Sequence, residues 1–128
     1  MDADASNSNA PLPRLVDWKV AEDVVGGDAE LLLQVVDAFL QEAPQQMRAL
    51  ASAVAANDAP TVRRAAHTLK GSLRYFGVRS AFDLALQLEQ AGQKNELRAA
   101  PAAVEQLSAA LSLVLDELRS YYARGGRA

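Results

Sequence analysis

Residues 59–77, APTVRRAAHTLKGSLRYFG, decide the fold, because they have the pattern of an amphipathic helix with a single apolar side. At about 100° per residue, their apolar side chains cluster within about 60° of one direction. These side chains are Val62, Ala65, Leu69, Leu73 and Phe76. His67, the only histidine of the chain, falls on the opposite side. The segment therefore predicts a helix from about Ala59 to Tyr75 that buries one stripe and exposes the histidine.

The composition of the whole chain also favours helices. Of the 128 residues 50% are apolar and only 5% are aromatic, and Ala and Leu dominate. Small and straight-chain side chains lose little rotamer freedom in a helix. A chain of this length is expected to form one domain around a single modest core. We therefore expect an all-α fold.

Helical spacing and helix-ending residues divide the chain into five expected helices. Their ranges are about 17–25, 28–57, 59–75, 79–93 and 101–122. Pro44 lies inside the second range and predicts either one kinked helix or two nearly collinear ones, because proline lacks an amide hydrogen. Gly92 and Asn95 are expected to end the fourth helix. Short connections make neighbouring helices antiparallel, which predicts an antiparallel four-helix bundle with a short extra N-terminal helix.

The two ends of the chain differ from this middle part. Residues 1–14 are polar and contain two prolines, which predicts a linker, and residues 124–128, RGGRA, are expected to be a disordered tail. The domain itself is expected to cover residues 15–123. The N-terminal stretch lacks the basic start and apolar middle of a secretory signal. No run of residues is apolar enough to span a membrane, so a cytoplasmic location without membrane contact is expected.

Charge and residue types exclude several classes of site. The chain has no cysteine and one histidine, so no thiolate metal site is available and no resident metal or other cofactor is expected. Its net charge of -3 opposes nucleic-acid binding, which depends on lysines and arginines that displace counterions from phosphates. A nucleic-acid partner is therefore not expected.

The outer face of the 59–75 helix carries cations and one unexpected glycine. The residues within about 60° of His67 are Arg63, Arg64, Lys70, Gly71 and Arg74. An ordinary solvated face would explain the arginines but not Gly71, because glycine inside an exposed helix costs about 1 kcal/mol relative to alanine. We interpret Gly71 as open space that lets a group of another protein reach the imidazole.

The chemistry that fits this face is phosphoryl transfer. A neutral imidazole keeps one unprotonated ring nitrogen, which can act as a nucleophile. Lys70 stands about one turn away and is expected to attract an arriving anion. Positioning and charge neutralisation supply most of the catalysis in phosphoryl transfer, and an exposed histidine beside cations offers both.

Glu89 is a second unexpected residue, because it falls within the apolar arc of the 79–93 helix. A carboxylate at a packing seam costs several kcal/mol unless it has a partner. One interpretation is that Glu89 lies at the edge of the seam and reaches water. The other is that it accepts a hydrogen bond from Nδ1 of His67, which orients the ring and leaves Nε2 as the nucleophile.

These residues resemble the histidine-containing phosphotransfer (HPt) family of bacterial phosphorelays. AHTLKGSLRYFG, residues 66–77, matches the family's A-H-x-L-K-G followed by a second glycine. GGDAELLLQVVDAFLQEAP, residues 26–44, is similar to the family's first long helix, and LALQLEQAG, residues 84–92, to its Leu-Glu helix. The resemblance covers roughly residues 15–120.

The resemblance implies a role for each residue of this site. His67 would accept a phosphoryl group from a receiver-domain aspartate and pass it to another receiver, Lys70 would help to neutralise it, Gly71 would clear the docking surface, and Glu89 would bond the ring. The predicted partner-docking residues are Arg63, Arg64, Arg74 and Tyr75. Small residues in place of Arg74 and Tyr75 would leave a flatter face, so these two bear on partner choice. The domain would have no ATP site, and the receiver would bring Mg²⁺.

Other interpretations remain open beside this one. A kinase dimerisation helix pair also carries a phosphorylated histidine, but an acidic residue would follow the histidine where Thr68 stands, and such a pair must dimerise whereas we expect a monomer. A bundle that only docks receivers would have the same surface. A hydrolase using His67 as a base is disfavoured because Ser72 is expected on the other side of the helix. The linker-like start favours the C-terminal module of a hybrid sensor histidine kinase over a freestanding shuttle.

Overall fold

A computed structural model describes residues 15–126 of the chain, and within them it has five helices and no strands. The helices are α2 (Trp18–Val24), α3 (Ala29–Ala55), α4 (Ala59–Tyr75), α5 (Arg79–Lys94) and α6 (Ala100–Ala123). The prediction of an all-α bundle with a short extra N-terminal helix is confirmed. Residues 1–14 and 127–128 lie outside the described residues.

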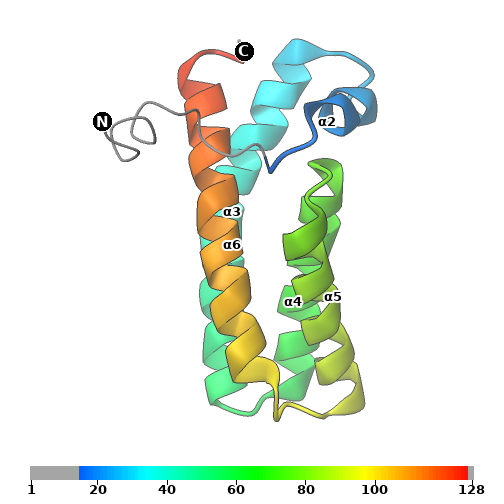
Figure 1. The fold of residues 1–128 in the computed structure, drawn as a ribbon, viewed down its shortest axis with the longest axis vertical. Helices are drawn as coiled ribbons and strands as arrows, with labels where there is room; N and C mark the ends of the chain where they lie inside the picture. The colour runs from blue at the N-terminus through cyan, green and yellow to red at the C-terminus, as the bar shows by residue number, and fades with distance from the viewer. Residues whose placement is uncertain (1–14, 127–128) are drawn as a thin grey trace, which may run out of the picture.

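The four long helices stand side by side, and α2 lies across one end of them (Figure 1). Helix α4 packs against α3 and α5, and α6 also packs against α3 and α5, so the four form a closed ring around the core. At about 1.5 Å per residue, the 27 residues of α3 and the 24 of α6 reach well beyond the 17 of α4 and the 16 of α5. Helix α2 lies in the space beyond the ends of the two shorter helices (Figure 1).

The apolar stripe of α4 faces the centre of the ring. Its buried residues are Ala59, Val62, Ala65, Ala66, Leu69 and Leu73, and Phe76 follows directly after the helix. Burying each large side chain of this stripe stabilises the fold by about 1.5–3 kcal/mol. The residues on the opposite side of α4, among them Arg63, His67 and Arg74, are exposed, so the packing that fixes α4 also presents its outer face to solvent.

Pro44 does not divide the long helix. Helix α3 is continuous from Ala29 to Ala55, with Pro44 inside it. Of the two expected arrangements, the single helix is the one observed. Buried Phe39 and Ala43 before the proline and buried Leu50 after it attach both halves to the same core, which outweighs the loss of one backbone hydrogen bond.

Gly92 has a different role from the expected one. Helix α5 continues past it to Lys94, and Asn95, with φ of 55°, caps the helix in the left-handed conformation. Gly92 is buried against α4, where a Cβ would lie 2.7 Å from the backbone nitrogen of Arg63 and 2.8 Å from the carbonyl oxygen of Ala59. The glycine therefore permits close contact between the backbones of α4 and α5.

A buried carboxylate joins the start of the described chain to the last helix. Glu117 of α6 is 9% exposed, and its Oε1 accepts hydrogen bonds from the backbone N–H groups of Leu15 (2.7 Å) and Val16 (3.1 Å). Its Oε2 accepts a hydrogen bond from Trp18 Nε1 (2.9 Å), and the Trp18 ring stacks on Tyr121 with ring centroids 4.1 Å apart. The sequence did not identify Glu117, because its partners lie about a hundred residues away.

The C-terminal end of α6 closes with a turn. Arg124, Gly125 and Gly126, which the sequence assigns to the tail, donate backbone hydrogen bonds to the carbonyl groups of the last turn of the helix, among them Tyr121 and Tyr122. Among the described residues, no helix has both the length and the apolar character needed to cross a membrane.

Candidate functional site

His67 lies near the middle of α4 on its outer face. Its side chain is 67% exposed, while the adjacent Ala66 and the nearby Leu69 are buried in the core. The alternation follows from the helical period: the residues that pack inward hold the backbone, and the histidine one position along is turned outward. The imidazole is therefore accessible to a second protein while its backbone is held by the bundle.

Glu89 of α5 connects His67 to Lys70. Its Oε2 lies 2.7 Å from His67 Nδ1, and its Oε1 forms an ion pair with Lys70 Nζ at 2.6 Å. The Glu89 side chain is only 15% exposed and that of Lys70 only 16%. The expected contact between Glu89 and Nδ1 is present, and the alternative in which Glu89 only reaches water is not observed.

The charge of Glu89 is maintained by its partners. Burial raises the pKa of its carboxyl group, but the contacts with Lys70 and His67 lower it by more, so the pKa lies below the ordinary value of 4.5. An ionised carboxylate can only accept hydrogen bonds, which makes Nδ1 of His67 the donor. In the neutral ring Nε2 is then unprotonated and is the nitrogen available for bond formation.

Lys70 is placed differently from the expected free cation. Its ammonium group is bonded to Glu89 and its side chain is mostly covered, so it does not stand open beside the imidazole. The helical spacing located Lys70 correctly along α4, but not the bend of its long side chain toward α5. An anion arriving at His67 would meet a lysine that already has a carboxylate partner.

Gly71 opens a shallow hollow beside the imidazole. A Cβ at position 71 would have no atom of residues 15–126 within 4 Å, so no contact within the described bundle requires glycine there. The hollow is lined by Val24, His67, Thr68, Gly71, Ser72, Arg74 and Tyr75, and we call it the His67 hollow. Ser72 was expected on the other side of the helix, but it lines the same hollow.

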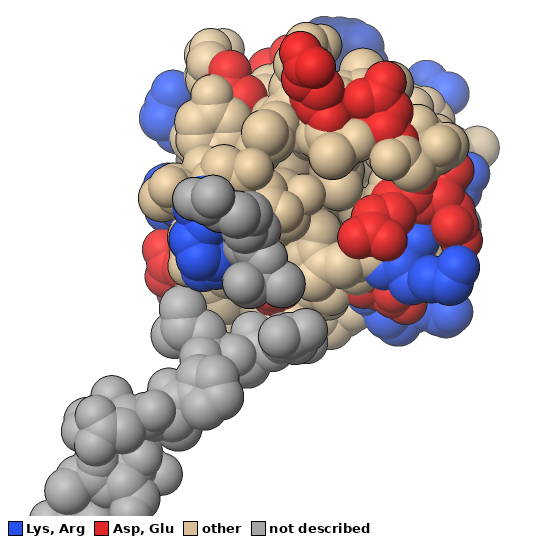
Figure 2. All heavy atoms as spheres, turned by 90° about the horizontal axis from the view of Figure 1, so that it is seen from above, with Lys and Arg blue, Asp and Glu red and all other residues tan. Residues whose placement is uncertain are grey.

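Large apolar side chains are exposed in and beside the His67 hollow. Val24 is 48% exposed, Tyr75 49% and Leu31 41%. Val24 and Tyr75 line the His67 hollow, and all three line an adjoining hollow between α2, α3 and α4, so uncharged surface continues from His67 toward the end of the bundle. In the view onto that end, uncharged surface lies between acidic and basic side chains (Figure 2). The sequence analysis gave no role to Val24.

The four predicted docking residues are all exposed on α4, but only two lie at the hollow. Arg74 and Tyr75 line it, and the guanidinium of Arg74 lies 5.6 Å from the centre of the Phe82 ring. Arg63 and Arg64 are further toward the start of the helix, where Arg64 Nη2 donates a hydrogen bond to Thr61 Oγ1. Their role in docking stays a prediction.

Acidic side chains and the histidine do not form a metal site in the described part of the chain. No group of three or more His, Asp or Glu side chains within residues 15–126 is close enough together to hold a metal ion. The site therefore consists of His67, its two polar neighbours Glu89 and Lys70, and the open surface around Gly71.

Comparisons with known proteins agree with this arrangement. A search of curated proteins finds no match. Among solved structures, the crystal structure of histidine-containing phosphotransfer protein B (HptB) from Pseudomonas aeruginosa PAO1 matches with a TM-score of 0.79 and 24% sequence identity, covering 86% of this chain and 96% of that chain. This likeness shows a shared fold. The family model described as Hpt domain matches residues 34–121, more than half of the chain, and includes His67, Lys70, Gly71 and Glu89. The chain thus belongs to the Hpt domain family, and its role is histidine phosphotransfer in two-component signalling.

Proposed function

We propose that His67 accepts a phosphoryl group from the phosphorylated aspartate of a receiver domain and passes it to the aspartate of a second receiver. The Nε2 lone pair forms the N–P bond while the P–O bond to the aspartate breaks, and the carboxylate leaves with the bonding electrons. In the second step a carboxylate oxygen of the other receiver attacks phosphorus, and the imidazole is released. The proton on Nδ1 stays on the ring throughout.

The observation that supports this proposal best is the exposed imidazole with Glu89 at its far nitrogen. When Nε2 bonds to phosphorus while Nδ1 keeps its proton, the ring becomes positively charged. The carboxylate 2.7 Å from Nδ1 balances that charge as it develops, and it is already in position before the reaction. The pair therefore favours the phosphorylated ring electrostatically, and it makes Nε2 the attacking atom.

The neighbouring residues have supporting roles in the proposal. Gly71 leaves space for the acidic pocket of the receiver, and Lys70 helps to neutralise the phosphoryl group once it shares its charge between that group and Glu89. Arg63, Arg64 and Arg74 attract an acidic partner surface, and Tyr75 contacts it. The receiver supplies the Mg²⁺ that holds the phosphoryl oxygens, because its pocket carries the carboxylates for it.

The proposal also covers the partners of the domain and its position within a larger protein. Receiver domains are the expected donors and acceptors, and the linker-like composition of residues 1–14 favours a position beside other domains, as in a hybrid sensor histidine kinase. The alternative is a bundle that docks receivers without taking the phosphoryl group, for which the exposed apolar surface around Val24 and Tyr75 would suffice.

Radiolabel transfer separates these two functions. Receiver domains from the same genome are phosphorylated with labelled acetyl phosphate and mixed with the purified protein. We expect label on the wild-type protein and none on His67→Gln, which keeps the shape of the docking surface. Glu89→Ala should be labelled at least about tenfold more slowly, because the charge on the ring then has no carboxylate beside it.

Two controls complete the experiment. The second receiver, unphosphorylated, should take the label from the isolated phosphorylated protein. Docking is measured with His67→Gln and each receiver by isothermal titration. A receiver that binds the wild-type protein but never transfers label to it would refute phosphotransfer and support the docking-only bundle. Label that persists on His67→Gln would show that another residue is the acceptor.

A further inference from the structure

We infer that Glu117, on the helix furthest from the histidine, is a positioning residue for receiver docking: it fixes α2 so that Val24 forms one wall of the His67 hollow. The inference rests on the proposed function, because it concerns the partner of the same site. It assigns a role to a residue that takes no part in the chemistry and lies outside the docking face of α4.

The attachment of the N-terminal segment to Glu117 is specific. Both carboxylate oxygens are used, Oε1 by the N–H groups of Leu15 and Val16 and Oε2 by the indole of Trp18. A carboxylate that is only 9% exposed is unfavourable unless it accepts such hydrogen bonds. A core position on α6 that served packing alone would be better filled by an apolar residue, so the carboxylate points to a role in holding this segment.

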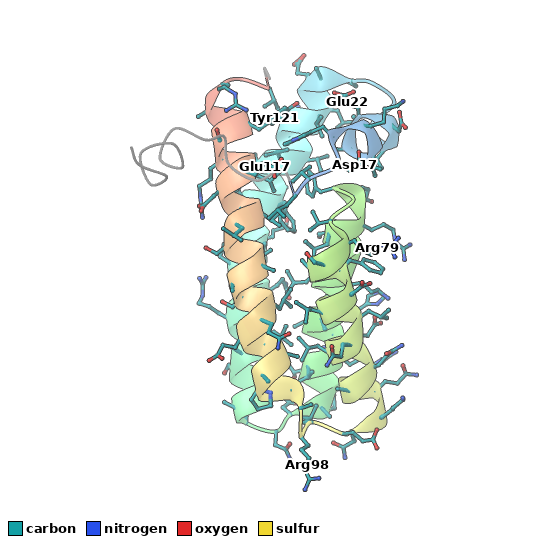
Figure 3. The ribbon with its side chains drawn as sticks, viewed as in Figure 1. Asp17, Glu22, Arg79, Arg98, Glu117 and Tyr121 are labelled. Carbon is teal, nitrogen blue, oxygen red and sulfur yellow. The ribbon has the colours of Figure 1, made fainter. Side chains whose placement is uncertain are left out.

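A second set of contacts holds the same segment against α4. The backbone N–H of Asp17 donates a hydrogen bond to the carbonyl of Phe76 at 2.8 Å. Gly77, with φ of 61°, lies so near that a Cβ there would come within 2.7 Å of the Asp17 Cβ. The start of α2 is therefore clamped between α6 on one side and the end of α4 on the other. In the side-chain view, Glu117 and Tyr121 lie at the end of α6 that this segment crosses, and Arg98 lies at the opposite end of the molecule (Figure 3).

Helix α2 connects the clamped segment to the His67 hollow. It has only seven residues, too few to be stable alone, and of these only Ala21 is buried. Its position thus depends on what holds its two ends, which is the clamp at Trp18 and the packing of Val25 on the core. Its last residue, Val24, lines both the His67 hollow and the adjoining apolar hollow. Loosening the Trp18 end should displace the Val24 wall without touching His67, Glu89 or Lys70.

The expected kinetic consequence is a change in docking and not in chemistry. In Glu117→Gln the side-chain amide has one acceptor oxygen, so either the two backbone N–H groups or the Trp18 indole must face an NH₂ group. The half-saturating concentration of phosphorylated receiver should rise about tenfold, while the limiting transfer rate stays within about twofold. Phosphorylation by phosphoramidate, a small donor that needs no docking surface, should be unchanged.

The single tryptophan of the chain reports on the clamp directly. Trp18 fluorescence should shift to longer wavelength in Glu117→Gln. Glu105→Gln is the matched control, because Glu105 is an exposed glutamate on the same helix. It should leave the fluorescence and the half-saturating concentration as in the wild type.

Two further variants keep the inference testable if Glu117→Gln folds poorly. Trp18→Phe keeps an aromatic ring against Tyr121 but removes the indole N–H, and it should weaken docking in the same direction. Val24→Ser changes the exposed wall itself, and it should raise the half-saturating concentration without altering Trp18 fluorescence. Combined with Glu117→Gln it should add little, because both changes remove the same wall.

The outcomes distinguish this inference from the proposed function. A wild-type protein that takes no label from any receiver overturns the proposed function and the inference with it. If Val24→Ser and Trp18→Phe both take up label normally, with the half-saturating receiver concentration of the wild type, the inference is overturned but the proposed function is not. A Glu117→Gln protein that loses phosphoramidate reactivity as much as receiver transfer also overturns the inference, because the residue would then act on the whole fold.

Discussion

At the residue scale, the carboxylate of Glu89 links the imidazole of His67 to α5 and to Lys70. The pKa of Glu89 is lowered in the folded chain. At pH values where the carboxyl group is ionised in both the folded and the unfolded chain, Glu89 therefore stabilises the fold. This contribution is lost as the carboxyl group takes up a proton. The contribution is therefore fully present above the ordinary value of 4.5 and falls as the pH drops through the lower value of the folded state.

A pH series tests this link. We expect the difference in free energy of unfolding between the wild type and Glu89→Gln to be constant at neutral pH and to shrink below about pH 4.5. In Lys70→Met the decline should be smaller, because the cation that lowers the Glu89 pKa in the folded state is gone. Urea unfolding of the wild type and both variants between about pH 3 and 7 measures these differences in free energy of unfolding. An equal difference at all pH values would mean that the ion pair contributes nothing.

Gly71 is a residue where stability and function are expected to oppose each other. A Cβ there meets nothing within 4 Å, so Gly71→Ala should raise the free energy of unfolding by about 1 kcal/mol through helix propensity. Gly71→Leu fills the His67 hollow and should slow transfer from a phosphorylated receiver at least about tenfold, while phosphoramidate labelling continues. Equal losses with both donors would contradict the view that Gly71 provides access.

The positions of several site residues could be predicted from the sequence, whereas Ser72, the Lys70 side chain and Val24 were misplaced or missed, and the roles of all of them stay predictions. Periodicity located His67, Gly71 and Glu89 because each depends only on its angle around one helix. Lys70 was placed on the right face, but its flexible side chain turns to a carboxylate on another helix, which one helix's period does not encode. Val24 was missed because its importance comes from its position beside α4, a tertiary feature.

At the scale of helices, alanine substitutions at Gly92 and Gly71 are expected to change the free energy of unfolding in opposite directions. Both are glycines inside helices, but a Cβ at Gly92 would lie 2.7 Å from backbone of α4. Gly92→Ala should lower the free energy of unfolding by about 1–3 kcal/mol, because α4 and α5 must separate to admit the methyl group. Urea unfolding of the two alanine variants side by side measures it. A Gly92→Ala protein as stable as the wild type would show that the backbones separate readily.

The helix boundaries were predictable because they depend on local chemistry. The aspartates at 17, 28 and 58 each accept a hydrogen bond from the backbone N–H three residues on, as expected of N-caps. Gly92 was taken for a helix end because glycine is common there, whereas its actual role depends on the distance to α4. Packing between helices outweighed local propensity at this residue, and at Pro44 as well.

At the scale of the whole molecule, the ring of four helices and α2 differ in how firmly they are held. Helices α3 to α6 supply most of the core, whereas α2 contributes only Ala21 to it, beside Val16 that precedes the helix, and is held in addition by the clamp at Glu117. The sequence predicted the ring, since each long helix carries its own apolar stripe. It could not predict the clamp, because the residues at its two ends are separated by about a hundred positions and neither has a recognisable local pattern.

This difference predicts that α2 opens before the ring unfolds. A segment with few buried apolar contacts opens with a smaller free energy than the shared core. In wild-type protein the backbone amides of Ala21 to Val24 should exchange with deuterium at least about tenfold faster than those around Leu69 and Leu107, which are buried in the ring. In urea, the Trp18 fluorescence transition should precede the loss of helical circular dichroism, and Glu117→Gln should widen the gap. Coincident transitions and equal protection would mean that α2 is an integral part of the core, and that the Val24 wall moves only when the whole domain unfolds.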